Sequence, residues 1–432
     1  MKKISILTIG DELLIGQILN SNVQWISDQI TSIGGDVITH LTVGDRESEI
    51  IQALDSLLLK CDAIIIGGGL GPTHDDLTME AVSHYANIPL EYDADWVSKL
   101  EVYFKSRNRP MAENNKKQGW LLKDAIRIDN DCGTAAGQHF KIGETDFFIV
   151  PGVPHEMKSM MNRYILPELA KSVSPVSQQI LKQTLLTTGV GESLLAERLD
   201  SFVQKVKQDP RFTLAFLPSN IEVRLRLLMK ASGKEDEALF HEWIEELRTL
   251  CGKDFYGIDP LSLEEKVITT LKEKNLTVAV AESCTGGFIS HRLTQISGSS
   301  SVFKGAIVAY QEAVKISELG ISPALLKEKG PVSEEVAKAM ADAIRKKWNA
   351  DFGIATTGYL GPHGGDAFAK TGTVYISFSS NSHQETRCFH LGDDRVLGKE
   401  RATQAALDLL RRSLSLVTHR INSCFAASPG PS

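Results

Sequence analysis

Hydrophobic residues in the first third of the chain form short runs that alternate with segments of helical spacing. Residues 4–9, 37–43 and 62–67 are apolar runs of strand length, whereas residues 20–33 and 47–59 repeat with a helical period. Strands separated by helical segments are typical of a parallel sheet with helices on both faces. The pattern therefore predicts an α/β fold, in which ligands bind beyond the carboxyl ends of the strands.

The pattern changes in the middle of the chain. Residues 221–227 alternate between apolar and polar side chains, as a half-buried strand does, and residues 234–250 have helical spacing. These segments predict a small α+β module. Its predicted start follows the stretch 171–179, which is rich in Ser and contains Pro, a composition typical of linkers.

The last third returns to alternating strands and helices. Ser262-Leu-Glu-Glu265 has the spacing of a capping box, which opens a helix, and Ser333 followed by two acids marks another helix start. Strands are expected at residues 277–281, 351–356 and 372–378, and a terminal helix at 401–417. We therefore expect three folded parts, at 1–170, 177–256 and 260–420, with a disordered tail at 421–432.

Composition narrows the possible functions. The 432 residues include 47 Lys and Arg against 54 Asp and Glu, for a net charge of −7, which argues against general nucleic-acid binding. No apolar stretch approaches the length of a membrane span. The six cysteines are scattered without a CxxC pair, as in a protein with reduced thiols. We expect a cytoplasmic protein without membrane or nucleic-acid partners.

Candidate nucleophilic chemistry is concentrated in one segment of the last third. Ser300, Tyr310 and Lys315 bring a hydroxyl, a phenol and an amine within sixteen residues. A serine needs a neighbouring base to attack an amide, and a lysine can serve if burial lowers its pKa. The alternative is that residues 299–301 cap a helix while Tyr310 is half-buried and Lys315 is solvated.

A glycine-containing turn precedes this segment, between an expected strand and an expected helix. Thr285, Gly286 and Gly287 suit phosphate binding, because glycines allow close backbone approach and a helix N-terminus attracts anions. Cys284 is a rival nucleophile at the same turn. Cysteine is more often a small buried side chain than a nucleophile.

Two polar loops follow expected strands in the first third. One is Gly10-Asp11-Glu12, and the other contains Gly68, Gly69, Gly71 and Thr73, whose backbone amides could hold phosphate groups. The candidate ligands for a hard divalent cation are the carboxylates of Asp11, Glu12, Asp75 and Asp76. Asp75 and Asp76 also suit the first turn of the following helix, where negative charge is favourable.

Long motifs in each part resemble the competence/damage-inducible CinA family over nearly the whole chain. The motifs are Thr8-Ile-Gly-Asp-Glu-Leu-Leu, Gly68-Gly-Leu-Gly-Pro-Thr-His-Asp-Asp76, Pro151-Gly-Val-Pro-His-Glu-Met157, Ala281-Glu-Ser-Cys-Thr-Gly-Gly287 and Gly298-Ser-Ser300 with Tyr310 and Lys315. The resemblance implies a molybdopterin-binding-like domain, a KH-like connector and a C-terminal amidohydrolase domain for nicotinamide mononucleotide (NMN).

The resemblance implies two activities. One is hydrolysis of the NMN amide to nicotinate mononucleotide and ammonia, with Ser300 as nucleophile, Tyr310 as proton-handling phenol and Lys315 as base. It needs no cofactor. The other is metal-dependent cleavage of a pyrophosphate such as ADP-ribose in the first domain. The residues implied for substrate binding are Ser283, Thr285, Gly286, Gly287, Gly361, Arg395, Gly68, Gly69, Gly71 and Thr73.

Some features leave alternatives open. Residues 363–371 depart from the family pattern, which puts substrate preference in doubt, and Gly189-Val-Gly-Glu192 lacks the GXXG spacing of nucleic-acid-binding KH domains. We interpret the middle module as a structural or dimerising connector and expect a homodimer. The first domain is alternatively a nucleotide or pterin sensor without catalysis. The whole protein is alternatively an accessory factor for DNA uptake or recombination.

Overall fold

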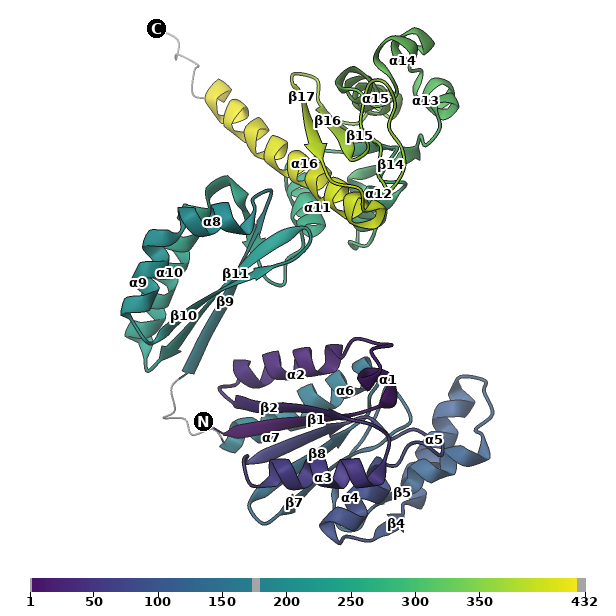
Figure 1. Cartoon of the computed structure of the whole chain (residues 1–432), viewed down its shortest axis with the longest axis vertical. Coiled ribbons are helices and arrows are strands. Elements are labelled where there is room, and N and C mark those ends of the chain that lie inside the picture. Colours follow the sequence, from purple (N-terminus) through teal and green to yellow (C-terminus); the bar gives the residue numbers. More distant parts are fainter. Residues whose placement is uncertain (1, 173–178, 426–432) are drawn as a thin grey trace. The chain divides into compact units, whose positions relative to one another are not determined.

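A computed structural model describes residues 2–172 and 179–425 (Figure 1). Most of the predicted linker at 171–179, and residues 426–432 of the predicted tail, lie outside the described residues. The chain divides into two compact units, residues 1–181 with 229–237 and residues 182–228 with 238–432.

The first unit is built on a mixed sheet in the order β2-β1-β3-β8-β7-β6. β1 pairs in parallel with β2 and β3, and β3 pairs in parallel with β8, whereas β7 and β6 continue the sheet antiparallel. The central strands are buried along almost their whole length, which explains their apolar runs. The strands are β1 (Lys3–Ile9), β2 (Asp36–Val43), β3 (Ala63–Gly67), β6 (Ile126–Ile128), β7 (Gly137–Ile142) and β8 (Thr145–Val150).

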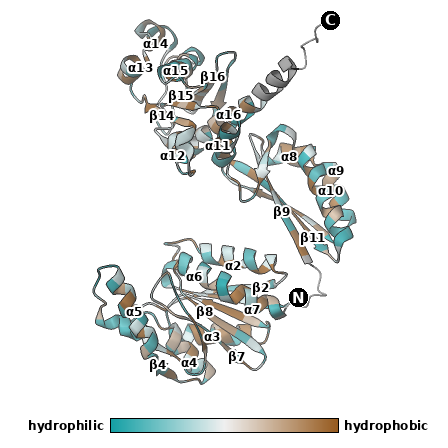
Figure 2. Cartoon of the chain, turned by 180° about the vertical axis from the view of Figure 1, so that it is seen from behind, coloured by the Kyte–Doolittle hydropathy of each residue, from teal (hydrophilic) through white to brown (hydrophobic). Residues whose placement is uncertain are grey.

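Successive side chains of these strands point to opposite faces, and helices cover both. Leu7, Ile64 and Ile66 pack on one face, in a cluster with the apolar sides of α3 and α4. Ile4 and Ile6 pack on the other face with α2, α6 and α7. The hydropathy colours of Figure 2 show the apolar strands between more polar helices. The helices are α1 (Asp11–Leu14), α2 (Ser21–Ser32), α3 (Glu47–Leu58), α4 (Thr78–Ala86), α6 (Pro154–Met160) and α7 (Leu166–Ser172).

A smaller substructure extends the first unit beyond α4. β4 (Leu90–Tyr92) pairs antiparallel with β5 (Trp120–Leu122), and α5 (Ala94–Ser106) and the 3-10 helix η1 (Glu113–Gly119) lie between them in the chain. Trp96 and Leu100 of α5 pack with Leu121 in a separate small cluster. Gln118 of η1 reaches the glycine loop, where its amide donates to the Leu70 carbonyl at 3.1 Å.

The middle module has a sheet in the order β10-β11-β9-β12. Its strands are β9 (Gln179–Thr188), β10 (Phe212–Pro218), β11 (Glu222–Ala231) and β12 (Phe255–Ile258), and its helices are α8 (Glu192–Arg198), α9 (Asp200–Gln208) and α10 (Lys234–Cys251). Phe202 of α9 and Trp243 of α10 meet edge to face, with ring centroids 5.7 Å apart. The strand and helix predicted at 221–227 and 234–250 are confirmed.

The last part has a sheet in the order β14-β13-β15-β16-β17, parallel from β14 to β15 and antiparallel beyond. The cluster on one face includes α11, α12 and α16, and the cluster on the other includes α14 and α15. The strands are β13 (Val278–Glu282), β14 (Phe303–Val308), β15 (Phe352–Gly358), β16 (Thr373–Ser379) and β17 (Gln384–His390). The helices are α11 (Leu263–Lys274), α12 (Phe288–Thr294), α13 (Glu312–Leu319), α14 (Pro323–Lys329), α15 (Glu334–Lys347) and α16 (Arg395–Phe425).

The predicted α/β fold class is confirmed, and both predicted caps form: Ser262 accepts from Glu265 N and Ser333 from Val336 N. The expected terminal helix is longer than predicted. It begins at Arg395 and ends at Phe425, so residues 421–425 are helical rather than part of a disordered tail. No proline interrupts residues 395–425, which allows the helix to continue. Within the described residues, none of the helices combines the length and the apolar character that crossing a membrane requires.

Candidate functional site

Three neighbouring strand ends of the second unit open onto one cavity of about 510 Å³. β13 lies between β14 and β15 in parallel, so their carboxyl ends meet at one edge of the sheet. Ser283 follows β13 directly, and Tyr310 follows β14 by two residues. The residues lining the cavity include Ser283, Cys284, Tyr310, Gln311, Glu312, Lys315, Thr357, Tyr359, Leu360, His363 and Arg395.

Lys315 and Ser283 form the polar contact that is most relevant to chemistry here. Lys315 is 3% exposed on α13, and its Nζ donates to Ser283 Oγ and to the Ala309 carbonyl, both at 3.1 Å. Burial lowers the pKa of Lys315 because the charged ammonium loses solvation. The cavity therefore contains a serine hydroxyl in contact with an amine that loses its proton more easily than a solvated lysine.

The structure does not bring Ser300, the nucleophile predicted from the sequence, into this cavity, so that role stays a prediction. Ser300 is exposed in a 3-10 turn, Ser299–Ser301, before β14, whereas Tyr310 lies beyond the other end of that strand. The strand alone separates the two ends by about 20 Å at the usual rise per residue. The hydroxyl beside Lys315 is that of Ser283, which the sequence had assigned to substrate binding.

Cys284 lines the same cavity but is a poor candidate nucleophile. It is 8% exposed, and burial raises the pKa of its thiol to about 12. A thiolate is the reactive form of cysteine, and it is disfavoured in this environment. The interpretation of Cys284 as a buried packing residue agrees with its surroundings.

Tyr310 and Arg395 lie together at the mouth of the cavity. An Nη atom of Arg395 donates to the Tyr310 hydroxyl, and the other donates to the Leu360 carbonyl at 2.9 Å. Gly361 is not among the lining residues, but its carbonyl is 3.4 Å from Arg395. A Cβ on Gly361 would lie 1.8 Å from the Asp393 carbonyl oxygen, so this backbone approach requires glycine. Gly361 thus supports the loop that holds Arg395.

The turn predicted to bind phosphate is occupied by a carboxylate of the protein. Glu282 is fully buried, and its carboxylate accepts hydrogen bonds from the amides of Gly287, Ile289 and Ser290 at 2.9–3.1 Å. Thr285 is buried too, with its hydroxyl 2.8 Å from that of Thr356. The Glu282 carboxylate therefore already balances the positive end of the helix dipole. Thr285, Gly286 and Gly287 are absent from the cavity lining. The phosphate binding predicted for these three residues stays a prediction.

The divergent loop lies at the same cavity. Tyr359 and His363 line it, and the Tyr359 hydroxyl donates to Asp366 at 2.8 Å. Asp366 also accepts from the amides of Phe368 and Ala369, both at 2.8 Å. The departures at 363–371 therefore preserve an ordered turn, closed by a short bridge between Gly365 and Lys370.

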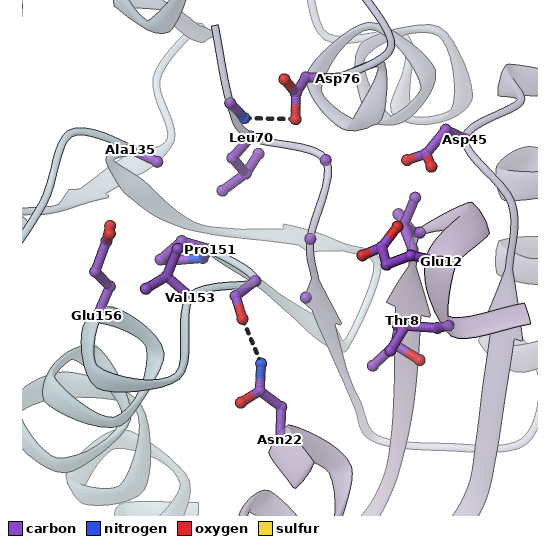
Figure 3. A pocket seen from close by; sticks show the side chains of 18 of the residues that line it. Thr8, Glu12, Asn22, Asp45, Leu70, Asp76, Ala135, Pro151, Val153 and Glu156 are labelled. Atoms are coloured by element: carbon purple, nitrogen blue, oxygen red, sulfur yellow. Dashed lines mark hydrogen bonds between the residues drawn. The ribbon is translucent and has the colours of Figure 1, made fainter. Parts of the chain in front are cut away.

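The first unit has its own cavity of about 510 Å³, at the carboxyl ends of β1, β3 and β8 (Figure 3). Gly67 pairs with Thr8 on one side and Val150 on the other, so the loops after the three strands converge. A Cβ on Gly68 would meet the Ile9 carbonyl at 2.3 Å, and one on Gly69 would meet the Thr78 hydroxyl at 2.1 Å. The glycines are therefore required for the close packing of the loop.

Several backbone amides of this glycine loop are already bonded. Gly68 N donates to the Val150 carbonyl at 3.1 Å. Asp76 accepts from Gly71 N at 2.7 Å and from Thr73 N at 2.9 Å. The predicted phosphate-binding residues line the cavity, but the amides of Gly68, Gly71 and Thr73 are not available to a ligand without rearrangement.

The four carboxylates predicted to bind a metal are not gathered into one set. Asp11 is absent from the cavity lining and lies 3.8 Å from Arg46, and Asp76 closes the glycine loop. Glu12, Asp75 and Asp76 line the cavity, together with Glu156 and the unpredicted Asp45. In the part of the chain that the structure describes, no three His, Cys, Asp or Glu side chains form a ready metal site.

Asp45 is the acid at this cavity whose pKa is perturbed. Burial raises the pKa of Asp45, and the nearby charges of Glu12, Asp11 and Asp76 raise it further. Figure 3 shows Glu12 and Asp45 on one side of the cavity and Glu156 on the opposite side. Carboxylate oxygens are the donors that hard divalent cations prefer, so this donor set fits such an ion chemically.

Three family models match successive parts of the chain. Residues 5–171 match the family model described as probable molybdopterin binding domain, residues 182–257 match the damage-inducible protein CinA KH domain, and residues 261–414 match the CinA C-terminal domain. A putative competence-damage inducible protein of Caldicellulosiruptor saccharolyticus is 38% identical over 413 residues, covering 95% of this chain and 98% of the relative. The chain belongs to the CinA family.

Two further relatives cover different shares of the chain. A CinA-like protein of Flavobacterium psychrophilum is 39% identical over 422 residues, which cover 95% of this chain and 98% of the relative. The solved structure of "the protein CinA with unknown function" from Thermoplasma acidophilum is 29% identical and covers 39% of this chain and 98% of that one, with a TM-score of 0.36. Membership of the CinA family is consistent with an enzyme.

The roles of two residues of this CinA-family protein were not predicted from the sequence. Asp45 follows β2 by two residues, so the rule that ligands gather at carboxyl strand ends would have found it. Glu282 ends a run of small apolar residues, Val278 to Ala281, where an acid is unusual. Its partners are amides five to eight positions later, which no side-chain pattern reveals.

Replacing Glu282 with Ala should destabilise the second unit by about 2–4 kcal/mol, because buried N–H donors lose their acceptor. We expect faster amide hydrogen exchange in a peptide spanning residues 284–295, measured by mass spectrometry, and a lower urea midpoint. The exposed Glu328, replaced by Ala, is the control and should change stability by less than about 0.5 kcal/mol. Unchanged exchange in the Glu282→Ala protein would contradict the capping role.

Proposed function

We propose that the second unit hydrolyses the carboxamide of a nicotinamide nucleotide, NMN, to the carboxylate and ammonia. The observation that carries the proposal is the 3.1 Å contact between Lys315 Nζ and Ser283 Oγ at a cavity. A buried amine of lowered pKa beside a hydroxyl is the arrangement that a serine–lysine hydrolase needs. The substrate itself comes from the family resemblance.

The proposed reaction has two steps, and its protons balance. Neutral Lys315 takes the proton of Ser283 Oγ as this oxygen attacks the carboxamide carbon, and the resulting ammonium gives the proton to the departing nitrogen, which leaves as ammonia. Lys315 then takes a proton from water, which attacks the acyl ester. Cleavage of the ester returns the proton from Lys315 to Ser283 Oγ and releases the carboxylic acid, which loses its remaining proton to water.

Arg395 and Tyr310 are proposed to orient the substrate. Both line the cavity and contact each other, so the guanidinium carries a positive charge at the cavity mouth that suits the phosphate of a nucleotide. We propose this pair as the anion-binding group, in place of the turn that Glu282 occupies. Tyr310 is exposed enough, at 55%, to meet a bound ligand.

Replacing Ser283 with Ala should lower ammonia release from NMN by at least about a thousandfold, because the nucleophile is lost. The matched control is Ser300→Ala, which we expect to stay within about twofold of the wild type, since surface substitutions are mostly neutral. Ammonia would be measured with a coupled dehydrogenase assay, and folding by circular dichroism. Loss of activity in Ser300→Ala with full activity in Ser283→Ala would refute the assignment.

The pH dependence of kcat/KM should report the ionisation of Lys315. The reactive form is the neutral amine, so kcat/KM should rise with pH through the Lys315 pKa, which burial moves below its ordinary 10.5. Cys284→Ala should retain this rising limb, and Lys315→Arg should abolish activity, because arginine stays protonated. A rising limb that disappears in Cys284→Ala would assign the titration to the thiol instead.

We propose as a second function that the first unit cleaves a nucleotide diphosphate such as ADP-ribose with a divalent cation. The support is the cavity where the glycine loop meets Glu12 and Asp45, whose like charges favour a bound cation. When bound, such an ion would polarise the diphosphate. Glu12 and Asp45 would hold it, and the glycine loop would allow the diphosphate to approach the backbone.

ADP-ribose cleavage should stop when divalent ions are chelated, whereas ammonia release from NMN should be unaffected. Glu12→Gln and Asp45→Asn should each lower AMP formation by at least about tenfold. Asp11→Asn is the matched control, because Asp11 lies outside the cavity lining, and it should keep most of the activity. Chromatography of AMP measures the reaction. Equal loss in all three variants would contradict the assignment to Glu12 and Asp45, and binding of ADP-ribose without cleavage would favour a sensor.

A further inference from the structure

A third cavity, of about 490 Å³, lies within the second unit between the middle module and helix α16. The loop after β9 lies against this helix: Gln404 donates to the Thr188 hydroxyl at 3.0 Å, and Arg412 donates to the Thr188 carbonyl at 3.2 Å. A Cβ on Gly189 would lie 2.9 Å from Arg412 Nη2. The cavity belongs to neither site described above.

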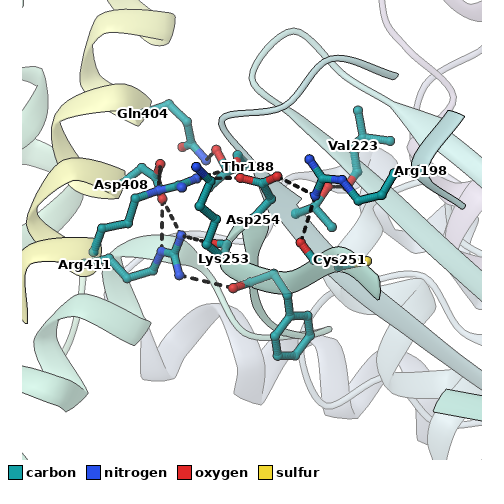
Figure 4. Close-up of polar contacts among 12 residues, drawn as sticks. Thr188, Arg198, Val223, Cys251, Lys253, Asp254, Gln404, Asp408 and Arg411 are labelled. Atoms are coloured by element: carbon teal, nitrogen blue, oxygen red, sulfur yellow. Dashed lines mark hydrogen bonds and ion pairs between the residues drawn. The ribbon is translucent and has the colours of Figure 1, made fainter. Parts of the chain in front are cut away.

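Positive charge predominates around the cavity. The charged lining residues are five basic ones, Arg198, Lys253, Arg387, Arg401 and Arg412, and two acidic ones, Asp254 and Asp408. Figure 4 shows the two acids already held by arginines. Asp254 accepts from Arg198 and Arg412, and Asp408 accepts from Arg411 and Arg412.

The acids therefore leave part of the positive charge uncompensated. Three arginines share the two buried carboxylates, and Arg387 pairs with Glu385. Within the described residues, neither Lys253 nor Arg401 has an acidic partner within 4.0 Å. Arg401 donates to the Asn220 carbonyl at 3.1 Å, which fixes its position without neutralising it. An anion is the ligand that this surplus favours.

The lining also includes apolar side chains. They are Leu194, which is 56% exposed, Ile221, Phe389 and Leu391. Apolar side chains and a few cationic groups around a volume of this size are typical of a small-molecule site. Phe389 can contact the face of a flat ring, while Lys253 and Arg401 contact a phosphate.

We propose that this cavity binds a small phosphate-bearing ligand with a flat ring, of the mononucleotide class. The cavity is of small-molecule size, and the Gly189 loop packs on α16 instead of facing solvent as a nucleic-acid clamp would. The charge of Lys253 and Arg401 binds the phosphate, and the apolar wall binds the ring.

The test uses the full chain and AMP as the probe. Photo-crosslinking with 8-azido-AMP, followed by peptide mapping, should label peptides that contain Phe389 or Ile221, and inorganic phosphate should reduce this label. In the double variant Lys253→Gln/Arg401→Gln the label at these peptides should require about tenfold more probe, because charge-assisted contacts are lost. The charge-matched control Lys346→Gln/Lys347→Gln should behave as the wild type.

Each outcome decides the proposal independently of the two proposed reactions. Label at Phe389 or Ile221 that falls only in the Lys253/Arg401 variant supports the site, whatever the activity toward NMN or ADP-ribose. Label confined to peptides of the other two cavities, or unchanged by the double variant, overturns it. Displacement of the probe by a single-stranded oligonucleotide at lower concentration than by AMP overturns it too, in favour of a nucleic-acid surface.

Discussion

The buried carboxylate of Glu282 determines how the chain leaves strand β13. It is fully buried, and three amides of the following turn and helix donate to it at 2.9–3.1 Å. A buried charge is tolerated only when hydrogen bonds replace its lost solvation, and the first amides of a helix supply donors and a favourable dipole. Since Ser283 is the next residue, the same bonds fix the backbone that carries the candidate nucleophile. The site depends on this cap, although Glu282 itself is absent from the cavity lining.

Lys315 presents the complementary case of a buried cation. Its Nζ contacts one hydroxyl and one carbonyl, and its nearest charged influences, Cys284 and Glu312, raise the pKa less than burial lowers it. The Glu282 carboxylate is surrounded by hydrogen-bond donors, whereas the Lys315 amine contacts only neutral acceptors. Hydrogen bonds therefore compensate the carboxylate for its lost solvation, whereas the loss of solvation of the ammonium is left uncompensated. That difference permits a proton-accepting lysine beside Ser283, because an unpaired buried ammonium readily gives up its proton.

The sequence predicted the fold far better than it predicted the partners within the site. Apolar runs and helical spacing report local burial, so the strands at β1, β3 and β13 could be found one segment at a time. Ser300 is absent from the cavity lining, because closeness along the chain is a poor guide to closeness in space once a strand intervenes. Ser300 and Tyr310 flank β14 at its two ends, whereas Ser283 and Lys315 are 32 positions apart and in contact. The parallel pairing of β13 with β14, a non-local feature, brings Ser283 to the same end of the sheet as Tyr310.

The two proposed reactions differ in what their sites still lack. Ser283 and Lys315 already touch, and a neutral amine can accept a proton without any added group. At the other cavity, burial raises the pKa of Asp45, and repulsion from the charges of Glu12, Asp11 and Asp76 raises it further. A proton or a cation can relieve that repulsion, and a diphosphate would bring more negative charge to the same place. Binding such a substrate therefore demands a cation there, whereas the carboxamide, being neutral, makes no such demand on the serine site.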